Sequence, residues 1–100
     1  MREFQNVQDW YQGVSQSDLA ANTRLVMFAL SLFADRVGAA VWPSVGTLAD
    51  RTGLSRPSVV KHLKLAEDAD WISVKRYDAN GTRLKRNEYS LKSPEVGDAA

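Results

Sequence analysis

The most informative stretch of the chain is residues 44–63, which read SVGTLADRTGLSRPSVVKHL. Ser44 and Ser55 each precede a run of helix-forming residues, and a serine in that place caps the first turn with its hydroxyl oxygen. Gly53 lies between the two runs and can take the positive φ that reverses a chain after a helix. The stretch therefore predicts two helices joined by a short turn, residues 45–52 and about 55–68.

The spacing of apolar residues predicts how these two helices pack. Two helices that meet near a right angle need a small residue where they touch, and Ala49 is that residue. Val59 then acts as an apolar wedge one turn into the second helix, while Leu48 and Leu54 fill the remaining core positions. Pro57 is compatible with the first helical turn, where no backbone N–H is needed.

The second of these helices has two different faces. At roughly 100° per residue, Val59, Leu63 and Ala66 form one inward stripe. The opposite side and its flanks are basic and hydroxylated near the helix start, a position that favours contact with phosphate and with base edges. These outward and flanking positions are Arg56, Pro57, Ser58, Val60, Lys61 and Lys64.

Residues 71–77 and 83–91 are rich in β-branched and aromatic residues and predict two strands. Asn80-Gly81 between them is typical of a two-residue hairpin turn. That turn places Ile72 opposite Tyr89 near the base of the ribbon.

The same turn would place like charges opposite one another, Arg76 across from Lys85 and Lys75 across from Arg86. Such pairs destabilise an isolated ribbon. They make sense if a phosphate backbone lies against it. Arg83 and the turn itself would then enter or straddle a minor groove.

The part of the chain before residue 44 predicts two further helices. Phe4, Val7, Trp10 and Val14 recur at helical spacing, with Gly13 as a stop signal. A second helix, residues 23–36, could be capped by Ser17 or Asn22 and ended by Gly38. It is apolar nearly all round, so the N-terminal segment or a second chain must cover it. Trp10 and Tyr11 are as compatible with the core as with a dimer; the candidate dimer contacts are Phe4, Val7, Trp10, Tyr11 and Phe33.

Length and composition limit the classes of protein. One hundred residues, 44% of them hydrophobic, are enough for one domain. We expect an N-terminal amphipathic segment (1–17), a main domain (18–92) and a flexible tail (93–100). The chain has no cysteine, no signal-peptide pattern and no apolar run long enough to span a bilayer, so we expect a cytoplasmic, nucleoid-associated protein.

The distribution of charge is uneven although the net charge is only +1. Residues 1–50 hold three basic and five acidic residues, whereas residues 51–92 hold ten basic and five acidic ones. This asymmetry indicates either a surface that faces a polyanion or an ordinary solvated basic surface.

Catalytic and metal-binding patterns are absent from the sequence. His62 is the only histidine, and no cysteine could join it in a metal site. We expect it to pack beside Leu63 at the edge of the core. No nucleophile with a base, no phosphate-binding glycine loop and no carboxylate pair is evident. We therefore expect no enzyme activity, no cofactor, no bound metal and no small-molecule ligand.

Several of these motifs together resemble one known family. They are Val41-Trp42-Pro43-Ser44, Leu48-Ala49, Gly53-Leu54-Ser55-Arg56, Val59, His62-Leu63, Trp71-Ile72 and Asn87-Glu88-Tyr89-Ser90-Leu91. From Leu19 to Leu91 the chain is similar to the winged helix-turn-helix domains of bacterial and phage proteins, among them regulators and replication-initiator-like proteins. The resemblance implies a mainly α fold with a small β-hairpin, namely a three-helix core plus a two- to three-stranded wing. Where such domains often have glycine before the Trp-Ile pair, this chain has Asp70.

The resemblance also implies a function. Such a domain would bind double-stranded DNA sequence-specifically, as a transcription regulator or as a replication, plasmid or phage accessory factor, and as a homodimer if two half-sites are read. A protein-interaction adaptor built on the same fold is the alternative. Ser55, Arg56, Ser58 and Lys61 would take the base- and phosphate-contacting positions. The full set of candidate DNA contacts is Ser44, Thr47, Ser55, Arg56, Pro57, Ser58, Val60, Lys61, Lys64, Lys75, Arg76, Asn80, Arg83, Lys85 and Arg86.

Overall fold

The structure is a computed structural model of the 100-residue chain, and it describes residues 7–34, 41, 43–76 and 87–94. This part of the chain forms a mainly helical fold with a small antiparallel sheet, as expected. The elements, in chain order, are α1 (Val7–Gln16), α2 (Ala21–Ser31), α3 (Val45–Thr52), α4 (Arg56–Asp68), β1 (Ile72–Lys75) and β2 (Glu88–Leu91).

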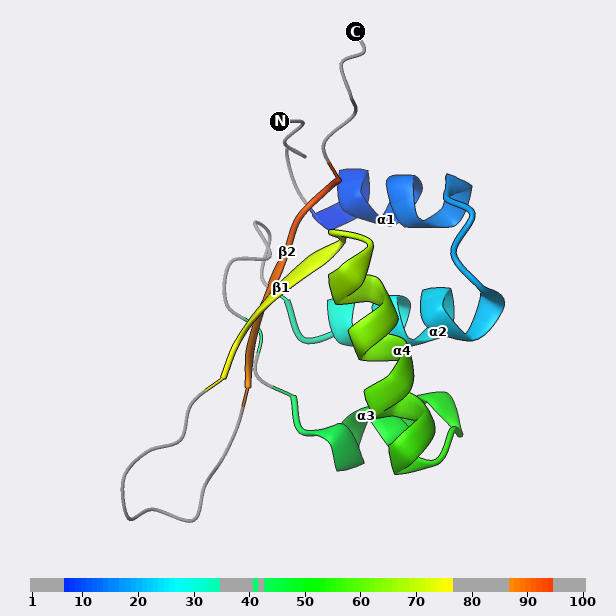
Figure 1. Cartoon of the computed structure of the whole chain (residues 1–100), viewed down its shortest axis with the longest axis vertical. Coiled ribbons are helices and arrows are strands. Elements are labelled where there is room, and N and C mark those ends of the chain that lie inside the picture. The colour runs from blue at the N-terminus through cyan, green and yellow to red at the C-terminus, as the bar shows by residue number, and fades with distance from the viewer. Residues whose placement is uncertain (1–6, 35–40, 42, 77–86, 95–100) are drawn as a thin grey trace, which may run out of the picture.

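Three helices pack against one another and the other elements are added to them (Figure 1). Helices α2, α3 and α4 contact each other pairwise, with α4 crossing in front of α2 in the view of Figure 1. Helix α1 packs on α2 at one end of the molecule, whereas α3 lies at the other end. The sheet runs along one side of α4, which it contacts through β1.

The core lies where α4 meets the other elements. The predicted inward stripe is confirmed, because Val59, Leu63 and Ala66 are all buried. Val59 and Ala66 expose none of their surface, so the outward face of α4 follows directly from this packing. The buried hydrophobic side chains that share the core are Trp10, Val14, Val26, Met27, Ala29, Leu30, Val41, Leu48, Ile72, Tyr89 and Leu91.

Helix α1 is a structural part of this core. The Trp10 ring is fully buried, and its Nε1–H donates to the backbone carbonyls of Trp71 and Lys92, at 3.1 Å each. Of the two roles left open for Trp10, packing within its own chain is therefore the one that the structure shows. Gly13 does not stop the helix, which continues to Gln16. A Cβ at Gly13 would lie 3.1 Å from the Trp71 ring, so the missing side chain lets α1 approach that ring.

Helix α2 begins at Ala21, two residues earlier than its sequence predicts, and it ends earlier, at Ser31. Its N-cap is Ala20, which makes no side-chain cap bond, so capping by Ser17 or Asn22 is wrong. The backbone N–H groups of Leu32 and Phe33 bond three residues back, which tightens the chain into a turn after Ser31. The predicted end at Arg36 and Gly38 lies outside the described residues.

The two strands pair with a register that differs from the predicted one by two residues. Ile72 pairs with Leu91, Val74 with Tyr89, and Lys75 with Glu88. The predicted pairs Ile72–Tyr89 and Lys75–Arg86 are therefore wrong, and Lys75 faces an acidic residue. A two-residue shift keeps every side chain on the same face of the sheet, so the hydrophobic pattern cannot distinguish the two registers.

Val41 extends this small sheet by one position. It forms an isolated antiparallel bridge with Tyr89, with two backbone hydrogen bonds of 2.9 and 2.8 Å between them. The ribbon thus has a third strand position beside β2. This agrees with the expected two- to three-stranded wing.

Candidate nucleic-acid interface

The turn between α3 and α4 is built by local capping, as the sequence predicts. The Ser44 hydroxyl oxygen accepts the Thr47 N–H at 3.0 Å, and the Ser55 hydroxyl oxygen accepts the Ser58 N–H at 3.2 Å. Gly53 has φ +78° and donates its N–H to the Ala49 carbonyl at 2.8 Å. The glycine is needed here because other residues rarely adopt this left-handed conformation. Together these bonds determine where α4 begins.

Four predicted contact residues therefore have a second, structural role. Ser44, Thr47, Ser55 and Ser58 all take part in the two caps, and the Ser44 and Thr47 hydroxyls are also 2.9 Å apart. The residues at the start of α4, Ser55, Arg56 and Pro57, are exposed, and the dipole of a helix favours an anion at its N-terminus.

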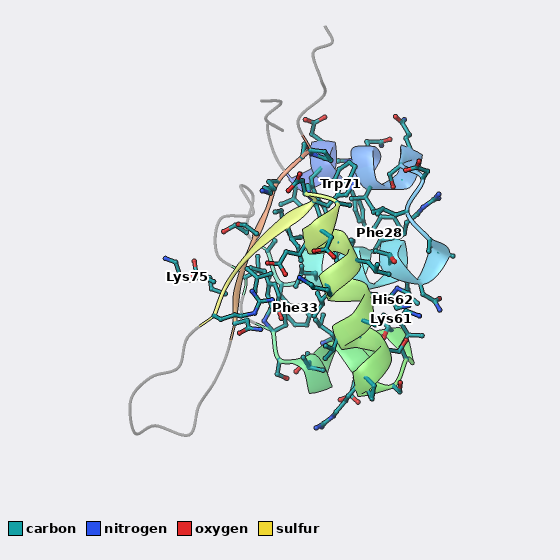
Figure 2. The ribbon with its side chains drawn as sticks, viewed as in Figure 1. Phe28, Phe33, Lys61, His62, Trp71 and Lys75 are labelled. Carbon is teal, nitrogen blue, oxygen red and sulfur yellow. The ribbon has the colours of Figure 1, made fainter. Side chains whose placement is uncertain are left out.

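The N-terminal half of α4 presents an exposed, positively charged face. Arg56, Pro57, Val60 and Lys61 are exposed, and Val60 exposes 52% of its surface. In the part of the chain that the structure describes, neither Arg56 nor Lys61 forms an ion pair. Figure 2 shows Lys61 beside His62 on α4. This half of the helix thus carries positive charge that no carboxylate of the described residues neutralises.

The C-terminal half of α4 differs, because its one cation, Lys64, is paired with an acidic residue. Lys64 Nζ lies 3.2 Å from Asp68 Oδ1, one helical turn further on. Both side chains are well exposed to solvent, so the pair contributes little to stability. Lys64 is therefore a weaker candidate for a DNA contact than Lys61.

Arg76, a predicted wing contact, forms an ion pair with α4. Its two terminal nitrogens lie 3.0 and 3.4 Å from the two carboxylate oxygens of Glu67, a fork-shaped pair that links β1 to α4. The Arg76 guanidinium lowers the pKa of Glu67, and Glu67 raises the pKa of Arg76. The predicted position of Arg76 opposite Lys85 cannot be compared, because Lys85 lies outside the described residues.

An open cavity of about 250 Å³ is lined by residues of both α4 and the sheet, beside this ion pair. Its apolar and aromatic lining residues include Val60, Leu63, Val74 and Tyr89. Burial raises the pKa of the Tyr89 hydroxyl above its ordinary value of 10.0. Three charged side chains, Lys64, Glu67 and Arg76, also line the cavity.

The remaining wing candidates are only partly described. Lys75 projects from the end of β1, away from the helices (Figure 2). Asn80, Arg83, Lys85 and Arg86, together with the predicted Asn80-Gly81 turn, lie outside the described residues. Their contacts stay predictions.

His62 has a structural role. It is almost fully buried, and its Nδ1 lies 2.8 Å from the hydroxyl oxygen of Thr23, which is also buried. The predicted position at the edge of the core is confirmed. Within the residues that the structure describes, no group of three or more His, Cys, Asp or Glu side chains could hold a metal ion.

Sequence reasoning missed two residues next to the candidate contacts. Glu67 holds Arg76 across two elements, and Gly46 lies under the side chain of Arg56. Neither contact has a local signal, because the partners are nine and ten positions apart and belong to different elements. A helical wheel places Glu67 on α4 but does not show that β1 passes beside it.

The comparisons with known proteins agree with this geometry. Residues 17–72 match the model of a protein family described as "Helix-turn-helix domain", which covers more than half of the chain. No curated protein and no solved structure is significantly similar to the chain. Among the described residues, no helix is long and apolar enough to cross a membrane. The matched residues include α2, α3 and α4, and α4 is the second helix of the helix-turn-helix motif, after α3. The chain therefore belongs to the helix-turn-helix domain family.

Proposed function

We propose that this domain binds double-stranded DNA in a sequence-specific manner, with α4 in the major groove. The observation that carries the proposal is the exposed N-terminal half of α4, where Arg56 and Lys61 are not neutralised by described carboxylates. Recognition helices read base edges mainly with their N-terminal residues. Arg56 can contact a guanine through two hydrogen bonds, whereas Lys61 suits a phosphate.

The wing would contribute contacts to the DNA backbone or to a minor groove. Lys75 points away from the helices at the end of β1, and the predicted contacts Asn80, Arg83, Lys85 and Arg86 follow it in the sequence. Arg76 is already held by Glu67, so it would help to set the angle of the wing on α4. The biological role that we propose is transcription regulation, or an accessory role in replication of a bacterial chromosome, plasmid or phage.

The test begins with selection of bound sites from a randomised DNA library, followed by fluorescence anisotropy with the selected duplex and a scrambled one. Arg56→Ala should weaken binding to the selected duplex by about 1–3 kcal/mol and leave the scrambled duplex nearly unaffected. Lys75→Ala should weaken both alike and reduce the salt dependence by about one phosphate contact.

Lys92→Ala is the matched control, since it removes the same charge at the far end of the sheet, beside Asp70 and α1. Lys92→Ala should change neither the affinity for the selected duplex nor that for the scrambled duplex. Absence of binding to any duplex at low salt would contradict the proposal and favour the adaptor alternative.

The same selection tests whether two domains bind together. Trp10 is buried in its own chain and offers no surface to a second one, but Tyr11 is 40% and Phe33 36% exposed. The Tyr11 ring packs edge-on against Phe28, and the Arg51 guanidinium lies over the Phe33 ring. Of the candidate dimer contacts that the structure describes, we propose that Tyr11, Phe33 and the partly exposed Val7 remain available to a second chain. A palindromic selected site with half-sites about one helical turn apart would support a dimer, and a single asymmetric site would contradict it.

A further inference from the structure

The first turn of α3 contains a glycine that is covered by the side chain of Arg56. A Cβ atom built on Gly46 would lie 2.9 Å from Nη2, 3.3 Å from Cζ and 3.5 Å from Nε of Arg56. All three of the nearest atoms thus belong to one guanidinium group. The planar group lies against the backbone of α3 at the place where another residue would carry its side chain.

The backbone of α3 does not itself require a glycine at this position. Gly53 is the only described glycine with a positive φ, so Gly46 has a conformation that any residue adopts. A glycine inside a helix destabilises it relative to alanine. No backbone atom is among the three nearest neighbours of the missing Cβ, and the far end of the flexible Arg56 side chain is the only obstacle that they include.

The missing side chain of Gly46 gives the Arg56 guanidinium a surface to pack against. Arg56 is the first residue of α4 and is exposed, and an exposed arginine has many rotamers. With its guanidinium against Gly46, the arginine borders an open depression of about 300 Å³ together with Ser44 and Asn87. A planar guanidinium held in one orientation loses less entropy when it forms two parallel hydrogen bonds.

We propose that Gly46 is a positioning residue for DNA recognition. By lacking a side chain, it lets the Arg56 guanidinium lie against α3 in the orientation that reads a base. The proposal rests on the function proposed above, in which Arg56 contacts a base edge. It adds that the discrimination between sequences depends on a residue that does not itself touch DNA.

The experiment compares Gly46→Ala, Arg56→Ala and the double variant with the wild type. The probes are the duplex selected by the wild type and a scrambled duplex of the same composition, and the readout is the ratio of the two affinities. Gly46→Ala should lower this ratio about tenfold while binding to the scrambled duplex stays unchanged. The double variant should match Arg56→Ala alone, because both changes remove the same contact.

Two controls separate this effect from a loss of folding. Urea unfolding should show that Gly46→Ala is at least as stable as the wild type, since alanine favours the helix. Gly13→Ala introduces the same methyl group on α1, where it meets the Trp71 ring rather than Arg56. It should leave the affinity ratio of the folded protein unchanged.

The possible failures are distinguishable. A wild-type ratio for Gly46→Ala, together with a lowered ratio for Arg56→Ala, overturns the role of Gly46 and leaves the proposed function standing. Additive losses in the double variant overturn it as well. If Arg56→Ala itself keeps the wild-type ratio, the assignment of Arg56 as a base contact fails, and the inference fails with it.

Discussion

Asp70 ends α4 in a left-handed conformation, with φ 67°. Its N–H donates to the Glu67 carbonyl and the Trp71 N–H donates to the Ala66 carbonyl, both at 3.0 Å. This is the two-bond arrangement of a Schellman motif, in which glycine is the usual left-handed residue. Aspartate is one of the few other residues that tolerate it. The departure from glycine noted in the sequence therefore leaves the backbone geometry intact.

The strain at Asp70 predicts an ordering of two variants. Asp70→Gly should be more stable than Asp70→Ala by about 1 kcal/mol, because only alanine pays the steric cost of a positive φ. Both variants lose the exposed ion pair with Lys92, at 3.6 Å, so this pair cancels in the comparison. Urea unfolding of the two variants measures the difference, and equal midpoints would contradict the left-handed conformation.

Single residues with local partners were the most predictable part of this chain. Ser44, Ser55 and Gly53 act on backbone groups only three or four positions away, so sequence spacing alone located both caps and the turn. The end of α2 was less predictable. The Ser31 hydroxyl donates to the Phe28 carbonyl at 2.6 Å, a local bond that competes with helix continuation and has no clear mark in an apolar sequence.

At the scale of elements, the link between α4 and β1 is the contact that sequence could not show. The fork between Glu67 and Arg76 joins a helix to a strand, and Ile72–Leu91 pairing sets the strand register. Both depend on how elements lie in space. The predicted turn at Asn80-Gly81 implied a different register, and alternation of side chains is the same in both. The like-charge argument for the wing therefore no longer holds for Lys75.

The ion pair between α4 and β1 predicts a specific pH dependence. Arg76 holds the pKa of Glu67 below its ordinary value of 4.5. The folded state therefore binds fewer protons than the unfolded state near this pH, so the pair stabilises the protein at neutral pH and less as pH falls through the lowered pKa. The free energy of unfolding of the wild type should exceed that of Glu67→Gln by about 0.2–1 kcal/mol at pH 7. This difference should shrink below pH 4.5.

Urea midpoints of both proteins at pH 7 and at acidic pH give this measurement. Arg76→Gln is the matched variant, since it removes the other partner of the pair. The difference in unfolding free energy between the wild type and Arg76→Gln should also shrink at acidic pH. A gap between wild type and Glu67→Gln that does not change with pH would show that the pair is not formed in solution.

At the scale of the whole molecule, the candidate DNA face and helix α1 lie at opposite ends. The start of α4 and α3 lie at one end, whereas α1 packs across α2 at the other end (Figure 1). The sequence left open whether α1 or a second chain covers the apolar α2. The structure shows that α1 does so through Trp10 and Val14, yet Leu25 and Leu32 keep 37% and 60% of their surface exposed. The candidate DNA face thus lies at the α3 end of the molecule, whereas the contact between α1 and α2 lies at the other end.

This separation allows the central claim to be tested in one measurement. Amide chemical shifts of the labelled domain are recorded by NMR while the unlabelled selected duplex is added. We expect the largest changes from Ser55 to Lys61, smaller ones near Lys75, and nearly none at Tyr11, Leu25 or Leu32. Changes confined to α1 and the exposed side of α2, with the N-terminal half of α4 unaffected, would contradict the account that α4 is the DNA-reading helix.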